Sequence, residues 1–171
     1  MNKNDFINKA LQIANSKTAY AYGFTGQTIT PELIAAKMKQ YPAWYTPERV
    51  KTLNSKCGYM GFDCSGLIKY LCNALGDPIK DINADSIYKT LCTPTNKAYA
   101  GCLAHKAGHI GIVIDDERVI ESSSASGGVV ISSVNNPKWK EFGAFNLLTN
   151  DATIDDLIAD IERVLSKYKG V

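Results

Sequence analysis

The chain has 171 residues, of which 45% are hydrophobic and 21% are charged, and this composition suits one globular domain with at most a short appendage. Its formal net charge is +2 and its lysines and arginines form no dense cluster, which argues against a nucleic-acid-binding protein. The five cysteines are odd in number and irregularly spaced, so we expect mostly free thiols rather than a disulfide framework.

The N-terminus, from Met1 to Lys9, lacks the continuous apolar core of a signal peptide. No stretch of the sequence is apolar for long enough to span a bilayer. We therefore expect a protein that is made in the cytoplasm and that reaches any target outside the cell after lysis or by an export route other than Sec.

The first third of the chain is predicted to be helical. Apolar residues recur at helical spacing in residues 5–16, which indicates an amphipathic opening helix. Two shorter helices follow, and each begins with a threonine cap and a proline at the first helical position. These starts are Thr30-Pro31-Glu32, in a helix that ends before Pro42, and Thr46-Pro47-Glu48. We interpret residues from about 25 to 57 as an inserted helical segment.

A longer helix is predicted in the middle of the chain, over residues 64–75. Asp63 can cap its first turn, its apolar residues fall on one face, and Gly76 and Pro78 end it. A further helix is predicted over residues 84–91.

The second half changes to the period of β-strands, and a last helix follows at residues 153–168, with one apolar stripe. Helices first and an antiparallel meander afterwards predict an α+β fold, with N-terminal helices packed on a small antiparallel sheet. We expect one domain over residues 1–148 and a C-terminal amphipathic helix within residues 149–171. The predicted strands are residues 109–114, 118–122, 129–134 and 142–148.

Cys64 occupies the first turn of the helix predicted over residues 64–75, directly after a glycine-flanked loop. Unpaired N–H groups and the positive end of the helix dipole gather at this position, and both lower the pKa of a thiol. The same N–H groups are donors for an oxyanion. Position alone leaves a catalytic nucleophile and a buried, inert thiol equally open for Cys64, whereas Cys72 lies on the apolar face of the same helix.

A nucleophilic cysteine needs a base, and the sequence has two histidines, His105 and His109. His109 begins the strand predicted over residues 109–114, in which three isoleucines at alternating positions mark the core face. The side chain of His109 is therefore predicted on the opposite face of the strand.

The hairpin that follows this strand supplies a partner for His109. If Ile110 and Ile120 form a cross-strand pair on the core face, Glu121 lies directly opposite His109 on the other face. A carboxylate there would fix the tautomer of the imidazole and favour its charged form. The same pattern also fits an ordinary surface His–Glu pair.

Four motifs in one order resemble those of the NlpC-type peptidases, a papain-like family of cell-wall cysteine peptidases. A strand and an aromatic residue at Val130-Ile131-Ser132 and Trp139 match the family's usual ending, so the resemblance covers roughly residues 5–148. The four motifs are Tyr20-Ala21-Tyr22-Gly23, Phe62-Asp63-Cys64-Ser65-Gly66-Leu67-Ile68, Gly108-His109-Ile110-Gly111-Ile112-Val113-Ile114 and Val119-Ile120-Glu121-Ser122.

The resemblance implies roles for individual residues. Cys64 would be the nucleophile, His109 the base, Glu121 the third, polar catalytic residue, and Tyr20 a tyrosine that helps to stabilise the oxyanion. Residues beside them would bind substrate, and Asp63 would bind a free amino terminus. The implied substrate-binding residues are Asp63, Ser65, Gly108 and Ser122.

The sequence departs from the family pattern in three places. The third catalytic residue is more commonly His in the family, and here it is Glu121. Family members usually carry Gly-Asp ahead of the histidine strand, whereas this chain has Gly101-Cys102. The inserted segment between Gly23 and Gly58 would lie beside the cleft.

The implied reaction is hydrolysis of an amide bond in peptidoglycan stem peptides, between D-glutamate and the diamino acid. The Cys64 thiolate would attack the carbonyl, His109 would protonate the leaving amine, and water activated by His109 would hydrolyse the thioester. No metal or organic cofactor is implied. We expect a monomer with peptidoglycan peptides as its partners, with no nucleic acid and no membrane span.

Three other readings remain open from the sequence. A related CHAP-type amidase also orders Cys, His and Glu and cuts the sugar–peptide linkage. An inactive, wall-binding module is a second. A zinc site is a third, because Cys102, His105 and His109 are spaced C-x2-H-x3-H and Cys57 or Cys64 would supply a further ligand.

Overall fold

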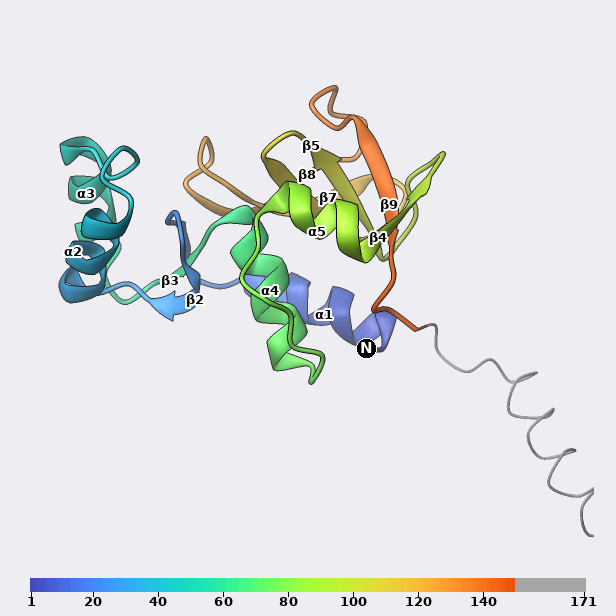
Figure 1. Cartoon of the computed structure of the whole chain (residues 1–171), viewed down its shortest axis with the longest axis horizontal. Helices are drawn as coiled ribbons and strands as arrows, with labels where there is room; N and C mark the ends of the chain where they lie inside the picture. The colour runs from blue at the N-terminus through green and yellow to red at the C-terminus, as the bar shows by residue number, and fades with distance from the viewer. Residues whose placement is uncertain (150–171) are drawn as a thin grey trace, which may run out of the picture.

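The computed structural model describes residues 1–149, which form two β-sheets and five α-helices (Figure 1). The C-terminal helix predicted over residues 153–168 lies outside the described residues. No helix in the described part of the chain is both long enough and apolar enough to cross a membrane. In chain order the helices are α1 (Lys3–Ala14), α2 (Pro31–Gln40), α3 (Pro47–Asn54), α4 (Cys64–Ala74) and α5 (Ala84–Leu91).

The larger sheet has six strands in the order β4-β9-β5-β6-β7-β8, and every neighbouring pair is antiparallel. Helices α1, α4 and α5 pack together on one face of it (Figure 1). The predicted α+β fold, with helices packed on an antiparallel sheet, is confirmed. The strands are β4 (Cys92–Thr95), β5 (Cys102–Lys106), β6 (His109–Val113), β7 (Arg118–Ser123), β8 (Gly128–Ser133) and β9 (Glu141–Phe145).

Five strands were absent from the sequence prediction: β4, β5 and the three strands of the smaller sheet. In the smaller sheet, β3 lies between β1, which is parallel to it, and β2, which is antiparallel. The strands of the smaller sheet are only three or four residues long, too short for a clear period. In the larger sheet, β5 is buried at four of its five positions, and β4 contains Pro94 on a sheet edge. The smaller sheet consists of β1 (Thr18–Tyr20), β2 (Thr25–Thr28) and β3 (Met60–Phe62).

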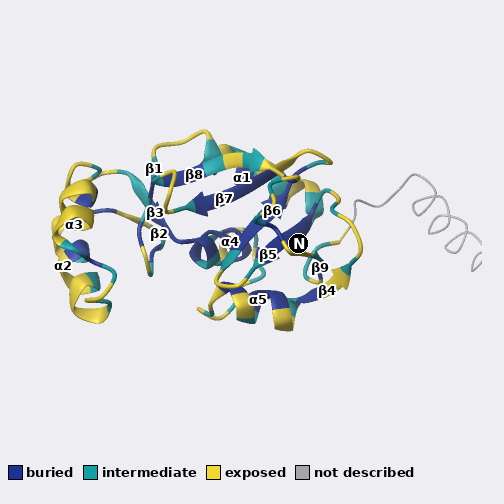
Figure 2. Cartoon of the chain, turned by 90° about the horizontal axis from the view of Figure 1, so that it is seen from above, coloured by how far each residue is buried: buried dark blue, intermediate teal, exposed yellow. Residues whose placement is uncertain are grey.

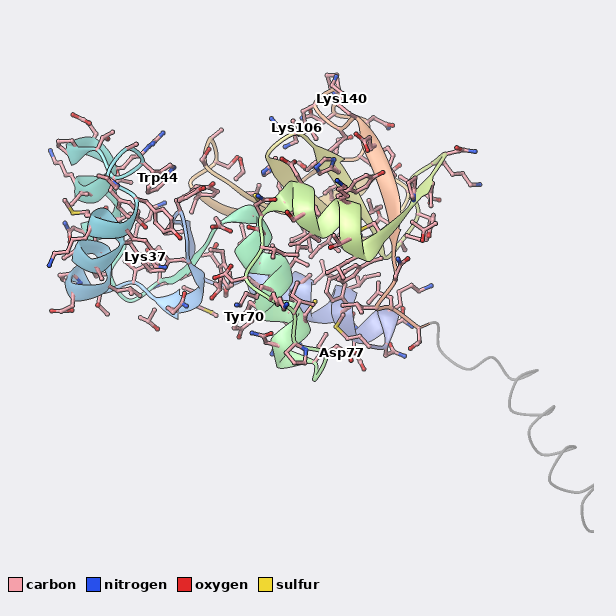
Figure 3. The ribbon with its side chains drawn as sticks, viewed as in Figure 1. Lys37, Trp44, Tyr70, Asp77, Lys106 and Lys140 are labelled. Carbon is pink, nitrogen blue, oxygen red and sulfur yellow. The ribbon has the colours of Figure 1, made fainter. Side chains whose placement is uncertain are left out.

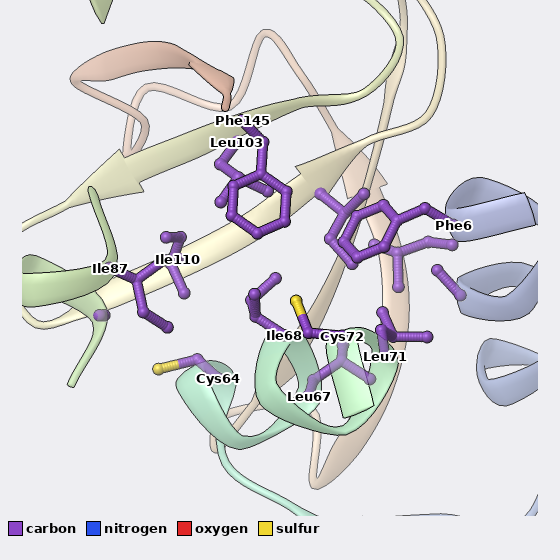
Figure 4. Packing of buried hydrophobic residues seen from close by; sticks show 14 of the residues in the cluster. Phe6, Cys64, Leu67, Ile68, Leu71, Cys72, Ile87, Leu103, Ile110 and Phe145 are labelled. Atoms are coloured by element: carbon purple, nitrogen blue, oxygen red, sulfur yellow. The ribbon is translucent and has the colours of Figure 1, made fainter. Parts of the chain in front are cut away.

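The main core lies between α4 and the larger sheet. Ile68 and Leu71 of α4 are fully buried against Ile110 of β6 and Phe6 of α1 (Figure 4). Cys72 points into this core as the apolar spacing of α4 predicts, whereas Cys64 lies at the first turn of the helix. The core therefore fixes the position and direction of α4, and with them the position of Cys64.

Three helix starts predicted from cap residues are confirmed. The side chain of Thr30 accepts a hydrogen bond from Leu33 N at the start of α2, and Thr46 accepts one from Arg49 N at the start of α3. Asp63 caps α4 in the same way. These caps satisfy N–H groups that the helix itself leaves unpaired.

The inserted segment forms a second, smaller core beside the smaller sheet. Helices α2 and α3 expose their outer faces and bury Ile34 and Leu53 towards the rest of the domain (Figure 2). The Tyr45 hydroxyl donates a hydrogen bond of 2.7 Å to the Tyr22 carbonyl and so ties this segment to the chain that follows β1. The segment is therefore held close to the end of β1, where Tyr20 lies.

Candidate active site

The main-chain geometry around Cys64 depends on a close approach of two loops. The Asp63 N–H donates to the Phe24 carbonyl at 3.0 Å, and Asp63 Oδ1 accepts from Gly66 N at 2.6 Å. A Cβ atom on residue 66 would lie 2.0 Å from the Phe24 carbonyl oxygen, so only glycine fits at this position. Asp63 and Gly66 are thus required by the turn that places Cys64 at the start of α4.

The Cys64 sulfur lies against the beginning of β6. The Cys64 thiol donates a hydrogen bond to the Gly108 carbonyl at 3.9 Å, and Cys64 is 7% exposed. Burial and the charge of Asp63 raise the pKa of Cys64 to about 11, although backbone N–H groups of Ile110 and Ser65 act in the opposite direction. The N–H groups at the start of the helix thus lower the pKa of the thiol as predicted, but burial outweighs them, so the net shift is upward and not downward.

His109 and Glu121 form a hydrogen-bonded pair on the other face of the sheet. His109 Nε2 lies 2.6 Å from Glu121 Oε2, and the Glu121 side chain is 1% exposed. The strands pair Ile112 with Ile120, two residues away from the predicted register. Glu121 is therefore diagonal to His109, but a shift of two residues leaves both side chains on the same face.

The loop between β6 and β7 accounts for this difference in register. Asp115 Oδ1 accepts hydrogen bonds from the N–H groups of Glu117 and Arg118, and Ile114 N donates to the Arg118 carbonyl at 3.0 Å. The side chain of Asp115 thus holds a three-residue loop, longer than the turn on which the predicted register rests.

Glu121 has a second partner that sequence reasoning missed. The Lys138 ammonium donates to Glu121 Oε1, while the other carboxylate oxygen is bound to His109. Although burial acts in the opposite direction, hydrogen bonds from His109 and Lys138 lower the pKa of Glu121 to about 2. The carboxylate is therefore ionised throughout the physiological range. No short-range pattern links Lys138 to Glu121, because the contact joins β7 to the loop that follows β8.

Trp139 forms one wall of the histidine site. Its ring stacks on His109 with centroids 5.5 Å apart and planes 11° apart. This stacking has room because residue 111, on the same face of β6, is glycine: a Cβ atom there would lie 3.0 Å from the Trp139 ring. The aromatic residue matched to the family's ending thus restricts rotation of the imidazole.

Tyr20 lies at the edge of the site, at the end of β1. It lines a cavity of about 290 Å³ together with His109 and Glu121. Burial raises the pKa of Tyr20 well above its ordinary value, and the charges of Cys64 and Asp63 act in the same direction. The phenol of Tyr20 therefore keeps its proton and is a hydrogen-bond donor near Cys64.

Asp63 and Ser65 line a different cavity, of about 350 Å³, together with Asp81. Asp63 Oδ1 accepts from Gly66 N and from the Ser65 hydroxyl, and Oδ2 accepts from Gly23 N at 2.7 Å. Burial raises the pKa of Asp63, and these hydrogen bonds oppose the rise. Asp63 thus has a structural role as the cap of α4. Its Oδ2 accepts one hydrogen bond and can accept another, so binding of substrate by Asp63 stays a prediction.

The other two residues implied to bind substrate differ in their position. Gly108 lines the cavity beside His109, and its carbonyl accepts a hydrogen bond from the Cys64 thiol. Ser122 has no exposed surface, and its hydroxyl donates to the Phe62 carbonyl at 2.9 Å. A substrate-binding role for Ser122 is therefore wrong: one residue after Glu121, the strand turns its side chain to the core face.

Asp85, which the sequence did not single out, supports the turn before His109. Its Oδ1 accepts a hydrogen bond from Gly108 N at 2.7 Å and lies 2.9 Å from His105 Nε2. One exposed carboxylate on α5 thus holds the end of β5 and the start of β6 together. An aspartate in the first turn of a helix is ordinary, so the sequence carried no signal of this contact.

The zinc-site reading is not supported by this geometry. His105 is paired with Ile110 across β5 and β6, so it points to the core face, whereas His109 points to the other face. Within residues 1–149, no group of three or more His, Cys, Asp or Glu side chains is arranged to hold a metal ion.

A family model described as the NlpC/P60 family matches residues 20–144. Over 84 residues the chain is 36% identical to a protein of Bacillus subtilis named probable peptidoglycan endopeptidase LytE. That match covers 47% of this chain and 25% of LytE, so the chain spans a quarter of the relative it matches.

Solved structures share the fold at low sequence identity. RipB of Mycobacterium tuberculosis, named a peptidoglycan hydrolase, is 19% identical with a TM-score of 0.51, over 84% of this chain and 66% of that chain. The P60 domain of antigen MAP1204 of M. avium subspecies paratuberculosis is 18% identical with a TM-score of 0.51, over 85% and 97%. NlpC1 of Trichomonas vaginalis is 14% identical with a TM-score of 0.56, over 85% and 44%. These likenesses confirm the papain-like fold. Because the family model matches residues 20–144 out of 171, the chain belongs to the NlpC/P60 family.

Proposed function

We propose that this chain is a cysteine peptidase that hydrolyses an amide bond in the stem peptides of bacterial peptidoglycan. One observation carries the proposal: Cys64 begins α4 beside the Gly108 carbonyl, and the next residue, His109, is held by the buried carboxylate of Glu121. The names of LytE, a probable peptidoglycan endopeptidase, and of RipB, a peptidoglycan hydrolase, support peptidoglycan as the substrate class.

The first step is attack of the Cys64 sulfur on the carbonyl carbon of the scissile amide. The raised pKa of Cys64 means that the resting thiol is protonated, so His109 must accept its proton as the sulfur–carbon bond forms. His109 Nε2 is bound to Glu121, which leaves Nδ1 to take this proton. Glu121 then stabilises the positive charge that the imidazole acquires.

Two donors are available for the oxyanion that forms on the carbonyl oxygen. The first is a backbone N–H in the first turn of α4, where the helix has no internal acceptors to satisfy it. The second is the phenol of Tyr20, which keeps its proton because burial raises its pKa. His109 next delivers the proton to the leaving amine, and the C–N bond breaks to give a thioester on Cys64.

Water completes the cycle. His109 takes a proton from water as the hydroxide oxygen bonds to the thioester carbonyl, and the sulfur leaves with the proton returned to it. Residues on the Asp63 side of Cys64 bind the acyl part of the substrate, with Asp63 near a free amino terminus. The bond cut is that between D-glutamate and the diamino acid.

Digestion of defined muropeptides, with products identified by mass, tests this function. We expect a dipeptide of alanine and glutamate, and a second product that begins with the diamino acid. Cys64→Ala should abolish product formation. Cys57→Ala is the matched control, because Cys57 is an exposed free cysteine outside the site, and it should keep wild-type activity.

Two results would contradict the proposal. Release of lactyl-linked sugars without peptide would identify a sugar–peptide amidase instead. Activity of Cys64→Ala equal to that of the wild type, or no activity of the wild type on any muropeptide, would remove the cysteine peptidase mechanism.

A further inference from the structure

A second cavity lies beside the catalytic one and connects it to the inserted segment. The catalytic cavity of about 290 Å³ and the neighbouring one of about 270 Å³ share three lining residues, Tyr20, Ser124 and Ala125. The two cavities meet at these shared residues, and we treat them together as one groove, here called the basic groove. It runs from His109 past the β7–β8 hairpin to α3.

Four lysine or arginine side chains line the basic groove, and one of them, Lys138, is paired with Glu121, which leaves three unpaired cations. Arg49 and Lys56 line its distal part, and Lys106 lines the part beside His109. None of the three takes part in an ion pair within residues 1–149. The carboxylate among the lining residues is Glu121, which is 1% exposed and already bound by His109 and Lys138. The groove therefore has a positive charge that no accessible carboxylate of its lining balances.

Backbone contacts hold the two distal cations in place. Arg49 donates from Nη1 to the Trp44 carbonyl at 2.9 Å, and its guanidinium lies 4.7 Å from the centroid of the Trp44 ring. Lys56 Nζ donates to the Gly127 carbonyl at 2.7 Å, which joins the end of α3 to the β7–β8 hairpin. In Figure 3, Trp44 and Lys106 lie at the two ends of this region. Both distal cations thus keep N–H donors for a ligand while their position is fixed.

The cleft is acidic on the other side of Cys64. The cavity that contains Asp63 also contains Asp81, and its lining residues include no lysine or arginine. A substrate that lies across Cys64 therefore meets negative charge at one end and positive charge at the other. Because His109 protonates the leaving amine, the basic groove is on the side of the leaving amine, and the acidic cavity is on the acyl side.

We propose that Arg49 and Lys56 of the inserted segment, with Lys106, bind a free carboxylate of the substrate on the leaving-amine side of the scissile bond. The orientation rests on the proposed function. The proposal makes this chain selective for stem peptides whose diamino acid keeps an ionised carboxylate, and unfavourable for those in which that group is an amide. Arginine is suited to such a role because its planar fork matches a carboxylate.

Binding to the Cys64→Ala protein tests the proposal independently of turnover. The probes are two tripeptides of alanine, γ-linked D-glutamate and a diamino acid, identical except for a carboxylate or a carboxamide at the C-terminus. Titration calorimetry should give an affinity for the carboxylate peptide that is higher by roughly 10-fold to 100-fold, as expected for hydrogen bonds to a charged group. In the Arg49→Gln/Lys56→Gln variant this ratio should fall towards one.

The controls separate the groove from the rest of α3. Lys51→Gln removes a charge from an exposed position of the same helix, outside the groove, and should keep the wild-type ratio. Arg49→Lys, which keeps the charge, should retain more of the preference than Arg49→Gln. Circular dichroism and thermal unfolding establish that each variant is folded.

Equal affinity for the two peptides, no measurable binding of either, or an unchanged ratio in the double variant would overturn the inference. Failure of the proposed function would give a different result. The binding assay would still show the carboxylate preference and its loss in the double variant, but the wild type would cleave neither peptide.

Discussion

Replacing Glu121 with Gln should lower kcat/KM on a stem-peptide substrate by roughly 100-fold and leave the protein folded. The substitution keeps the shape of the side chain and one hydrogen bond to His109 but removes the negative charge. Glu121 is 1% exposed and its Oε2 lies 2.6 Å from His109 Nε2, so water cannot replace that charge.

The magnitude follows from the charge that develops on His109. When the imidazole accepts the thiol proton, a positive charge forms about 4 Å from the centre of the carboxylate charge, worth about 4 kcal/mol at an effective dielectric constant of about 20. A neutral hydrogen bond from Gln returns about 1 kcal/mol. The remaining difference, about 3 kcal/mol, corresponds to roughly two orders of magnitude in rate.

Two assays measure this effect. The first is kcat/KM for a defined tripeptide, and the second is the rate of Cys64 alkylation by iodoacetamide, which requires His109 to take up the thiol proton. Glu117→Gln is the matched control, because Glu117 lies exposed in the β6–β7 hairpin. Thermal unfolding checks that Glu121→Gln remains folded.

The reasoning would be refuted if Glu121→Gln, folded at the assay temperature, kept kcat/KM within about threefold of the wild type. The buried carboxylate would then have a structural role through Lys138 and would not support the charge on His109.

Four further outcomes follow from the structure. Tyr20→Phe removes one donor to the oxyanion and should lower kcat on the same tripeptide by roughly 100-fold with little change in KM. An unchanged kcat would mean that backbone N–H groups alone stabilise the oxyanion. Asp85→Asn weakens the contacts to Gly108 N and His105, and should lower both kcat and the alkylation rate of Cys64 by roughly 10-fold. A lower alkylation rate with an unchanged kcat would contradict a role of Asp85 in positioning the start of β6. Ile68→Ala removes a buried side chain of α4 and should lower the free energy of unfolding by about 2–5 kcal/mol in urea titrations. A loss below about 0.5 kcal/mol would show that this side chain does not hold α4 in the core. The pKa of Glu121 is lowered from 4.5 to about 2, so its contribution to stability is complete above pH 4.5 and is lost as the pH falls through about 2. The stability gap between wild type and Glu121→Gln should narrow across that window, and a gap that is constant with pH would show that the charge of Glu121 does not stabilise the fold.

Short-range patterns in the sequence were sufficient for the starts of α2, α3 and α4 and for the shared face of His109 and Glu121. Thr30, Thr46 and Asp63 cap the helices that their spacing predicted, because a cap joins residues only three positions apart. Alternation along β6 and β7 placed His109 and Glu121 on one face, and this result survived an error of two residues in register.

Other parts of the site depend on contacts between segments far apart in the chain. Lys138 reaches Glu121 from the loop after β8, and Asp85 reaches Gly108 from α5, and no local spacing encodes either contact. The pKa of Cys64 reversed its predicted direction for the same reason. The helix N-terminus is a local feature, but the burial that outweighs it comes from β6 and the core packed around α4. Residue type and spacing along one element were enough to nominate Cys64, His109 and Glu121 as the residues that would carry the proposed chemistry. The tertiary structure alone decided how those residues are charged and supported, since burial and long-range hydrogen bonds exist only once the elements pack.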